Sequence, residues 1–335
     1  MELNTVSQSD FVKLANVLWQ KGLNSVSHVA RGSGLFKETP IPQNTGNTRE
    51  FSEIDTQEYA KTKAEGDQSE RAQVQQGYSK TMYQYRVALD IGITYEMRTQ
   101  NKYIEVTNRL KGLGRQVSNR MELDMSHRIG FAASTAYTNM DGTSVDVSVG
   151  DGFALAYSAH TLRGSSTTFR NILANNPKLS KGALEAIERL QVEETYNQFG
   201  EKMAMPFDVL WTSDDPNTVN TAREYLQATS DIEAANTGTP NVYKSKYRHV
   251  VLPLIATDAA GAVDSDKRYY WGLASSEYST AYLGIWEEPH LKGPSSTDSA
   301  EEFSTDDWNF GARGGYGLCT VSAAWFKMSK GDGTA

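Results

Sequence analysis

The sequence predicts an α+β fold in which a long hairpin and a long helix precede a mixed domain of helices and short strands. Residues 94–130 carry apolar side chains at the spacing of one helix face. Residues 38–92 contain an alternating segment that is typical of a strand. Residues 179–304 combine two helical patterns with several short strand patterns.

The composition favours a protein that associates with other subunits. The chain has 335 residues, enough for one large or two smaller domains, yet only 39% are hydrophobic. Such a chain often buries apolar surface between subunits. Its net charge is −8, with +2 in residues 1–130 (17 basic, 15 acidic) and −10 in residues 131–335 (16 basic, 26 acidic). Free-standing nucleic-acid binders are usually more basic, so we expect at most a mildly basic face near nucleic acid.

No motif points to catalysis or to a cofactor. Cys319 is the single cysteine, so there is no disulfide framework, and the five histidines lack metal-ligand spacing. The glycine-rich segment 311–317 matches neither phosphate-binding loop pattern and leads into a strand. There is no signal pattern and no run of about 18 apolar residues. We therefore expect no enzymatic activity, no cofactor, no metal and no membrane partner, and folding in a cytoplasm.

Residues 1–37 begin with a short amphipathic helix and continue as an irregular, glycine-rich segment. Phe11, Leu14, Val17 and Leu18 form the expected apolar face of the helix. Two interpretations are equally compatible with this pattern. The segment is either an arm whose apolar residues need a partner elsewhere, or a helix packed on its own domain.

Residues 38–92 predict a long two-stranded hairpin with a polar tip. The loop 39–48 leads in, the tip 61–73 is charged, and the return segment 79–94 alternates between polar and apolar residues. An isolated hairpin is marginally stable in water, so it needs another surface to lie on. In an assembly such a hairpin is a natural arm toward a neighbouring subunit.

Residues 94–130 predict one long helix that crosses the subunit as a spine. Its apolar residues recur in steps of three or four at Val106, Leu110, Leu113, Val117, Met121, Met125 and Ile129. At about 1.5 Å per residue, the helix would span roughly 50 Å. Gly112 and Gly114 are weak points that suggest a bend or a close approach by another segment.

The rest of the chain alternates between short strands and two helices. Residues 131–178 hold strand-like pieces and turns. Residues 179–198 and 214–231 predict helices, with Ser180 and with Asp214 or Asp215 as their caps. Several strand candidates and an acidic loop follow, and residues 308–328 form a closing strand.

This order of parts resembles the major capsid proteins of tailed bacteriophages, the Hong Kong 97 phage capsid fold, which encapsulins share. Residues 151–226 also resemble the head subunits of Mu-like phages. The resemblance there lies in Gly152, Leu155, Ser158, His160, Gly164, Asn171, Leu179, Ser180, Leu184, Gly200, Pro206, Leu210 and Ala222.

The resemblance implies a division of the chain into four parts. Residues 1–37 would be the N-terminal arm and residues 38–92 the extended loop over a neighbour. Residues 93–178, with the spine helix, would form the peripheral domain and be completed by residues 305–335. Residues 179–304 would form the axial domain.

The resemblance also implies a structural function. Many copies would assemble as pentamers and hexamers into an icosahedral shell around a double-stranded DNA genome, in a virion assembled in the host cytoplasm. A portal, a decoration protein and a scaffolding protein are the other implied partners. Residues 1–37 are too few for a fused scaffolding segment, which favours a separate scaffold or a trimmed chain. The alternative is an encapsulin-like compartment that encloses cargo protein.

Two sets of site residues follow from this resemblance. The extended loop would contact a neighbour through Phe51, Ile54, Tyr59, Lys61, Lys63, Arg71, Tyr78, Tyr83 and Tyr85. The spine would offer a genome-facing basic set, Arg98, Lys102, Arg109, Lys111, Arg115, Arg120 and Arg128, although these residues could instead pair with acidic neighbours on the same subunit. Some family members cross-link a lysine in this loop to an asparagine, but no motif here identifies such an asparagine.

Overall fold

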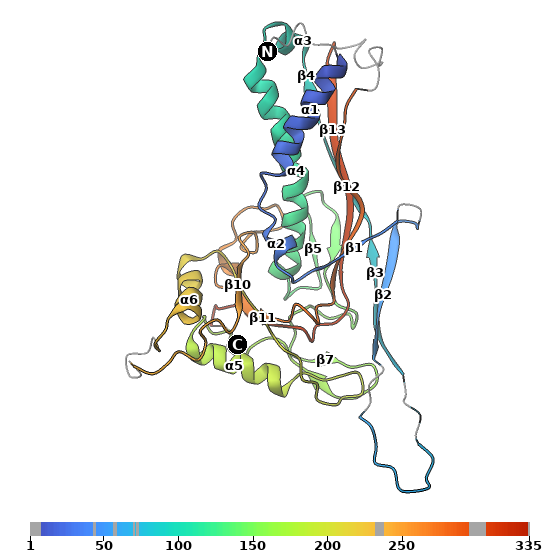
Figure 1. The fold of residues 1–335 in the computed structure, drawn as a ribbon, viewed down its shortest axis with the longest axis vertical. Helices are drawn as coiled ribbons and strands as arrows, with labels where there is room; N and C mark the ends of the chain where they lie inside the picture. The colour runs from blue at the N-terminus through green and yellow to red at the C-terminus, as the bar shows by residue number, and fades with distance from the viewer. Residues whose placement is uncertain are drawn as a thin grey trace.

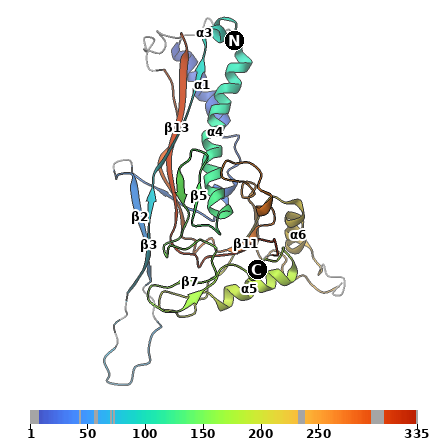
Figure 2. The ribbon, with the colours of Figure 1, turned by 180° about the vertical axis from the view of Figure 1, so that it is seen from behind.

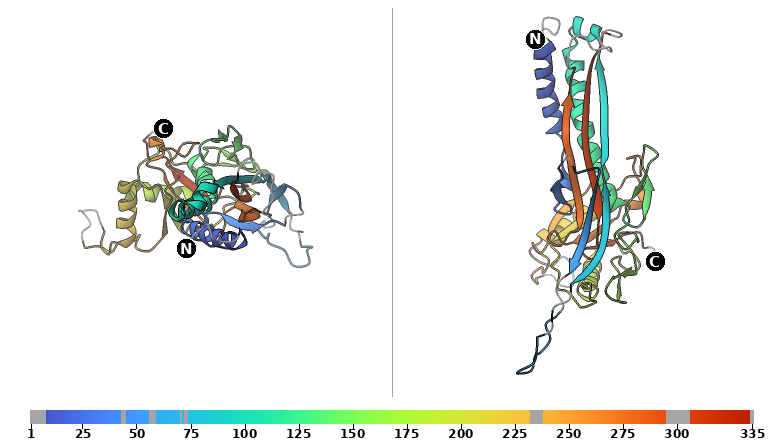
Figure 3. Two further views of the ribbon diagram at one scale, coloured as in Figure 1. Left: turned by 90° about the horizontal axis from the view of Figure 1, so that it is seen from above. Right: turned by 90° about the vertical axis from the view of Figure 1, so that its right-hand side faces the viewer.

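The computed structural model describes residues 8–42, 45–55, 59–69, 71, 74–231, 238–294 and 306–333. The molecule is elongated (Figure 1): a narrow blade of two helices and a long sheet stands on a broader body, and a hairpin projects past that body. The two helices of the blade, α1 (Gln8–Leu23) and α4 (Tyr103–Gly130), lie on the same face of its sheet (Figure 3).

The predicted spine is two helices, not one. α3 (Tyr95–Thr99) and α4 (Tyr103–Gly130) are separated at Asn101, whose φ of 58° lies in the left-handed region. Asparagine tolerates this left-handed conformation better than most residues. The break precedes the first residue of the apolar pattern, Val106, so the periodicity could not locate it. Within α4 the predicted apolar face is confirmed, because all seven of its residues from Val106 to Ile129 are buried.

The N-terminal helix packs on its own chain. α1 (Gln8–Leu23) buries Phe11 and Leu18 against α4 and the long sheet. Val17, predicted on the same face, is 51% exposed, whereas Ala15 and Trp19 are buried. The actual apolar face is therefore rotated from the predicted one, since it is set by the contact with α4.

Two glycines allow α1 and α4 to approach closely. A Cβ at Gly22 would collide with the Lys111 carbonyl, and a Cβ at Gly114 would collide with the Trp19 carbonyl. Gly112 has no atom within 4 Å of its would-be Cβ. The predicted close approach is thus confirmed at Gly114 and does not occur at Gly112.

The long sheet has the strand order β1-β12-β13-β4. β1 (Lys37–Pro40) pairs parallel with β12 (Ala281–Lys292), and the pairs β12–β13 and β13–β4 are antiparallel. The predicted closing strand 308–328 is two strands: β13 (Trp308–Thr320) in this sheet and β14 (Phe326–Ser329) in the sheet of the body. Trp308 and Phe310 of β13 lie in the helix-facing core. β4 (Tyr85–Ile93) lies at the other edge of this sheet.

The hairpin is shorter than predicted. β2 (Thr48–Asp55) pairs with β3 (Gln75–Tyr83), while the rest of the predicted return segment is β4, in the long sheet. Polar and apolar residues alternate on both sides of Gln84. This pattern could not show that the strand before Gln84 pairs with β2 and the strand after it pairs with β13. The described part of the tip, 59–69, projects beyond the body (Figure 1).

The body is built on a second sheet with the order β10-β9-β11-β14. Its strands are β9 (Val209–Thr212), β10 (Arg248–Val251), β11 (Trp271–Ala274) and β14 (Phe326–Ser329). The helices are α5 (Lys181–Glu193), capped by Ser180, and α6 (Pro216–Gln227), capped by Asp215. Both predicted helices are thereby confirmed.

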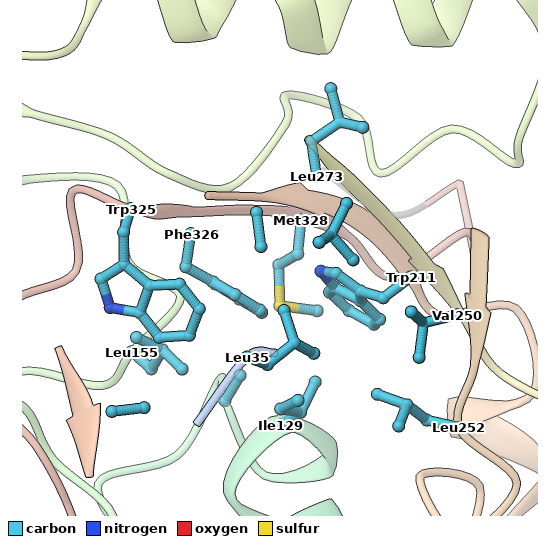
Figure 4. Close-up of a cluster of buried hydrophobic side chains, with 14 of the residues drawn as sticks. Leu35, Ile129, Leu155, Trp211, Val250, Leu252, Leu273, Trp325, Phe326 and Met328 are labelled. Atoms are coloured by element: carbon cyan, nitrogen blue, oxygen red, sulfur yellow. The ribbon is translucent and has the colours of Figure 1, made fainter. Parts of the chain in front are cut away.

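Smaller elements complete the fold. They are α2 (Val29–Gly32), the short 3-10 helix η3 (Ser265–Lys267), and the hairpins β5 (Ala136–Thr138)–β6 (Ser144–Asp146) and β7 (His160–Thr161)–β8 (Thr168–Phe169). In the core of the body, Trp211 and Phe326 stack with ring centroids 5.2 Å apart, next to Met328 and close to Leu35 from the N-terminal segment and Ile129 from α4 (Figure 4).

The predicted domain boundaries are crossed by two strands. β12 lies inside the segment 179–304 but pairs with β13 and β1 in the long sheet. β14 lies inside the segment 305–335 but pairs with β11 in the sheet of the body. The four-part division therefore stays a proposal, in which the C-terminal segment would belong to both domains.

Candidate subunit-contact and nucleic-acid-facing surfaces

The two strands of the hairpin are held on the body of their own chain. Lys80 Nζ lies 2.6 Å from Asp146 Oδ2 and 2.7 Å from Ser148 Oγ. The hydrogen bond from Lys80 helps to lower the pKa of the Asp146 carboxyl, against the effect of burial. Arg163 donates to the Gly77 carbonyl at 3.1 Å. The base of the hairpin is therefore a fixed part of this subunit, and the tip is the part that extends from it.

Three of the predicted loop-contact residues pack within their own chain. Phe51 stacks on Tyr282 with ring centroids 4.3 Å apart. The Tyr78 hydroxyl lies 2.8 Å from Thr161 Oγ1, and Tyr85 packs beside Tyr137. Each side chain is half-buried, so at most part of it is available to a neighbour.

The other predicted loop-contact residues lie further out. Tyr59 and Tyr83 are 67% and 60% exposed, and Lys61, Lys63 and Arg71 are also exposed. The Tyr59 hydroxyl donates to the Lys202 carbonyl at 2.8 Å, so the start of the tip touches the body. Ile54 lies in β2 opposite Gln76, and its side chain is outside the described part of the structure.

Three residues of the predicted basic set have partners in the same subunit. Arg98 lies over the Trp308 ring, 4.0 Å from its centroid, and donates to the Asp306 carbonyl. Arg120 pairs with Asp124 and Asp141, each at 3.1 Å. Arg128, 5% exposed, donates to the carbonyls of Asp146 and Leu318. The alternative of pairing with acidic neighbours on the same subunit thus describes Arg120. Arg98 and Arg128 also bind within the subunit, but through backbone carbonyls and an aromatic ring, and Arg128 has almost no surface for a nucleic acid.

The remaining four basic residues lie nearer the surface of α4. Lys102, Arg109 and Arg115 are exposed and Lys111 is half-buried. Arg109 donates to the Gly92 carbonyl at 2.9 Å and Arg115 to Ser25 Oγ at 2.8 Å. These two bonds use neutral acceptors, and none of the four residues makes an ion pair within the part of the chain that the structure describes. These four residues therefore form the basic set that we retain.

Sequence reasoning missed the buried charges. Asp124, 9% exposed, accepts a hydrogen bond from the Tyr316 hydroxyl, and burial raises the pKa of its carboxyl. Lys327 is fully buried and donates to the carbonyls of Arg170 and Glu194, at 3.0 and 2.8 Å. The only signal in the sequence was a lone lysine within an apolar strand, which is a weak indication of burial.

Burial shifts the pKa values of two side chains that could act chemically, Cys319 and His127. Burial raises the pKa of the Cys319 thiol to about 12, which keeps it protonated. Burial, together with the charges of Lys267 and Arg120, lowers the pKa of His127 to about 4. Among the described residues, no group of three or more His, Cys, Asp or Glu could hold a metal ion. Nor does any described helix have the length and apolar character needed to cross a membrane.

The fold is the Hong Kong 97-type capsid fold, the class defined by this hairpin, spine helix and paired sheets. Among solved structures, one titled Gordonia phage Cozz is similar over 91% of this chain and 89% of its own, at 12% identity and a TM-score of 0.51. Others are the bacteriophage PhiM1 mature capsid (88% and 85% covered, 11% identity, TM-score 0.48) and a virus-like particle from Pyrococcus furiosus (95% and 98% covered, 11% identity, TM-score 0.46). At 12% identity the likeness to the first of these structures shows the fold alone. No protein-family model and no curated protein sequence matches the chain.

Proposed function

We propose that this protein is the major capsid protein of a tailed bacteriophage. Its copies would assemble as pentamers and hexamers into an icosahedral shell around double-stranded DNA. The observation that carries this proposal is the fold, shared over nine-tenths of the chain with a phage protein. The protein would have a structural role and not an enzymatic one.

The arrangement of the hairpin supports self-association. Its base is fixed on the body while its tip, with exposed Tyr59, Lys61, Lys63 and Arg71, extends past it. A projecting segment of this kind gains stability by burying surface on a neighbouring copy. Obligate interfaces typically bury about 2,000 Å² or more, so contacts spread over the blade and body would have to contribute as well.

The retained basic residues support a weak, sequence-independent contact with the genome. Lys102 is the N-cap residue of α4, and Arg109, Lys111 and Arg115 lie within its first half. Such charges partly neutralise phosphates without reading the base sequence. A scaffolding protein, a portal and a decoration protein are further partners in this proposal, with the virion as the location.

Electron microscopy and sedimentation of the purified protein, with and without co-expressed neighbouring genes, test the proposal. We expect rings of five or six subunits, or closed shells. A compact monomer under all conditions would contradict it. Nuclease-protected DNA inside the shells supports a virus, whereas a cargo protein inside them supports the encapsulin-like alternative.

A further inference from the structure

β4 is an edge strand of the long sheet, and its outer side is open. It runs up the blade from β3 to α3 (Figure 2), and all nine of its residues pair with β13 without a register shift. Arg109 of α4 donates to the Gly92 carbonyl, so the backbone of Gly92 faces away from β13. Backbone groups alternate in direction along an antiparallel strand, so Arg86, Ala88 and Asp90 also face the open edge. Within the described residues, the backbone N–H groups of these three donate to no segment outside the sheet.

The two edges of the long sheet differ in their protection against further pairing. At the β12 edge, β1 covers only Tyr282–Ile285, and the part of β12 beyond it contains Pro289 and register shifts against β13. Proline has no backbone N–H and bulges interrupt a ladder, so both features oppose the addition of another strand there. β4 has neither a proline nor a register shift, and its edge is therefore able to accept a strand.

The charged side chains of β4 are complementary to a second copy of the same strand. Arg86 and Asp90 are exposed on the sheet face away from the helices, and neither makes an ion pair within the described part of the chain. Ala88 lies midway between them. In an antiparallel pair of two β4 strands centred on Ala88, Arg86 of each strand lies directly opposite Asp90 of the partner subunit. This register also sets residues whose backbone faces the open edge opposite one another, as hydrogen-bonded pairs require.

The apolar side chains of β4 fit the same register. Leu89 lies opposite Ala312, a residue of the helix-facing core, and yet is 44% exposed, while Val87 is half-buried. Both side chains stay accessible because no further strand lies beside them in the sheet. With Ala88 at the centre, Val87 of each strand lies opposite Leu89 of the partner subunit, which gives two apolar cross-strand pairs. Charge and hydrophobic pattern therefore favour one and the same register.

We propose that β4 is an interface between two copies of this chain, in which an antiparallel β4–β4 pair centred on Ala88 joins their long sheets into one. A two-fold axis perpendicular to the sheet relates the copies, so the helices of both stay on one face. Such a contact is isologous, whereas contacts within a ring of five or six subunits run head to tail. The β4 contact would therefore link subunits of neighbouring rings, and in this respect it rests on the proposed function.

The test is disulfide formation by Ala88→Cys in the purified full chain under mild oxidation. At the centre of the pair the two Cα atoms would lie about 5.5 Å apart, which is within the range that disulfides span. We expect a covalent dimer on a non-reducing denaturing gel, and the native Cys319 is buried and should add little background. Lys292→Cys, which changes an exposed residue of β12 at the other edge of the sheet, is the matched control and should stay monomeric on the gel.

A charge exchange tests the register. Added to Ala88→Cys, either Arg86→Asp or Asp90→Arg alone sets like charges opposite each other at two places and should lower the dimer yield about tenfold. Both exchanges together restore opposite charges and should restore the dimer, which a folding defect would not do.

Three results would overturn the β4 contact: no dimer with Ala88→Cys, an equal yield with Lys292→Cys, or no recovery in the double exchange. Rings or shells that form without the cross-link leave the capsid proposal standing. A cross-linked dimer that never forms rings or shells counts against the capsid proposal and leaves the β4 contact intact.

Discussion

The hydroxyl group of Tyr316 on β13 lies 2.5 Å from Asp124 Oδ2 on α4 and donates a hydrogen bond to this buried carboxylate. This bond joins the spine helix to the central strand of the long sheet. It also lowers the pKa of Asp124, partly offsetting the larger effect of burial.

Tyr316→Phe should destabilise the chain by about 1–3 kcal/mol, because it leaves a buried carboxylate oxygen without its donor. Urea unfolding measures the change, with Tyr103→Phe as the control on a more exposed tyrosine. Equal stability of the two variants would mean that Arg120 alone satisfies Asp124.

Gly114→Ala should destabilise the chain by about 1–3 kcal/mol, because a methyl group would push the Trp19 backbone away from α4. Gly112→Ala is the matched control two residues away. With nothing within 4 Å, it should be neutral or stabilising by up to about 1 kcal/mol through helix propensity. Thermal unfolding distinguishes them, and similar shifts in both would contradict the close approach of the helices.

Lys327 should make stability rise with pH. Burial lowers the pKa of its ammonium group to about 7, below the ordinary value of 10.5. Between these two values the unfolded chain binds more protons than the folded one, so the free energy of unfolding increases with pH. The slope from this group is at most about 1.4 kcal/mol per pH unit.

Lys327→Met should remove that slope, and the exposed Lys292→Met should keep it. Urea unfolding at several pH values from 7 to 9 measures both. An unchanged slope in Lys327→Met would assign the effect to another group.

Replacing Lys102, Arg109 and Arg115 by glutamine should reduce genome retention and leave shell assembly intact. In binding to non-specific DNA, the slope of log affinity against log salt concentration should become less negative. The change should be about one unit for each phosphate that is no longer neutralised. A triple variant of exposed basic residues elsewhere, Arg49, Lys244 and Lys292, provides the control. Normal packaging in the α4 variant would exclude this role.

The sequence by itself determined the elements whose pattern is local. The helix-face residues from Val106 to Ile129 and the alternation in β3 and β13 follow from side-chain periods of 3.6 and 2. The cap Ser180 follows from its residue type, whereas the choice between Asp214 and Asp215 was left open until the structure showed Asp215. Such signals depend on neighbours within a few residues, so they can be recognised before any fold is known.

Only the tertiary structure decided which partner each element has. It places β4 with β13 and not in the hairpin, rotates the buried face of α1, and separates α3 from α4 at Asn101. It also separates the exposed Arg109 from the buried Arg128, which look equivalent in the sequence of one basic helix. Burial and strand pairing depend on residues far apart in the chain, and no local pattern carries that information.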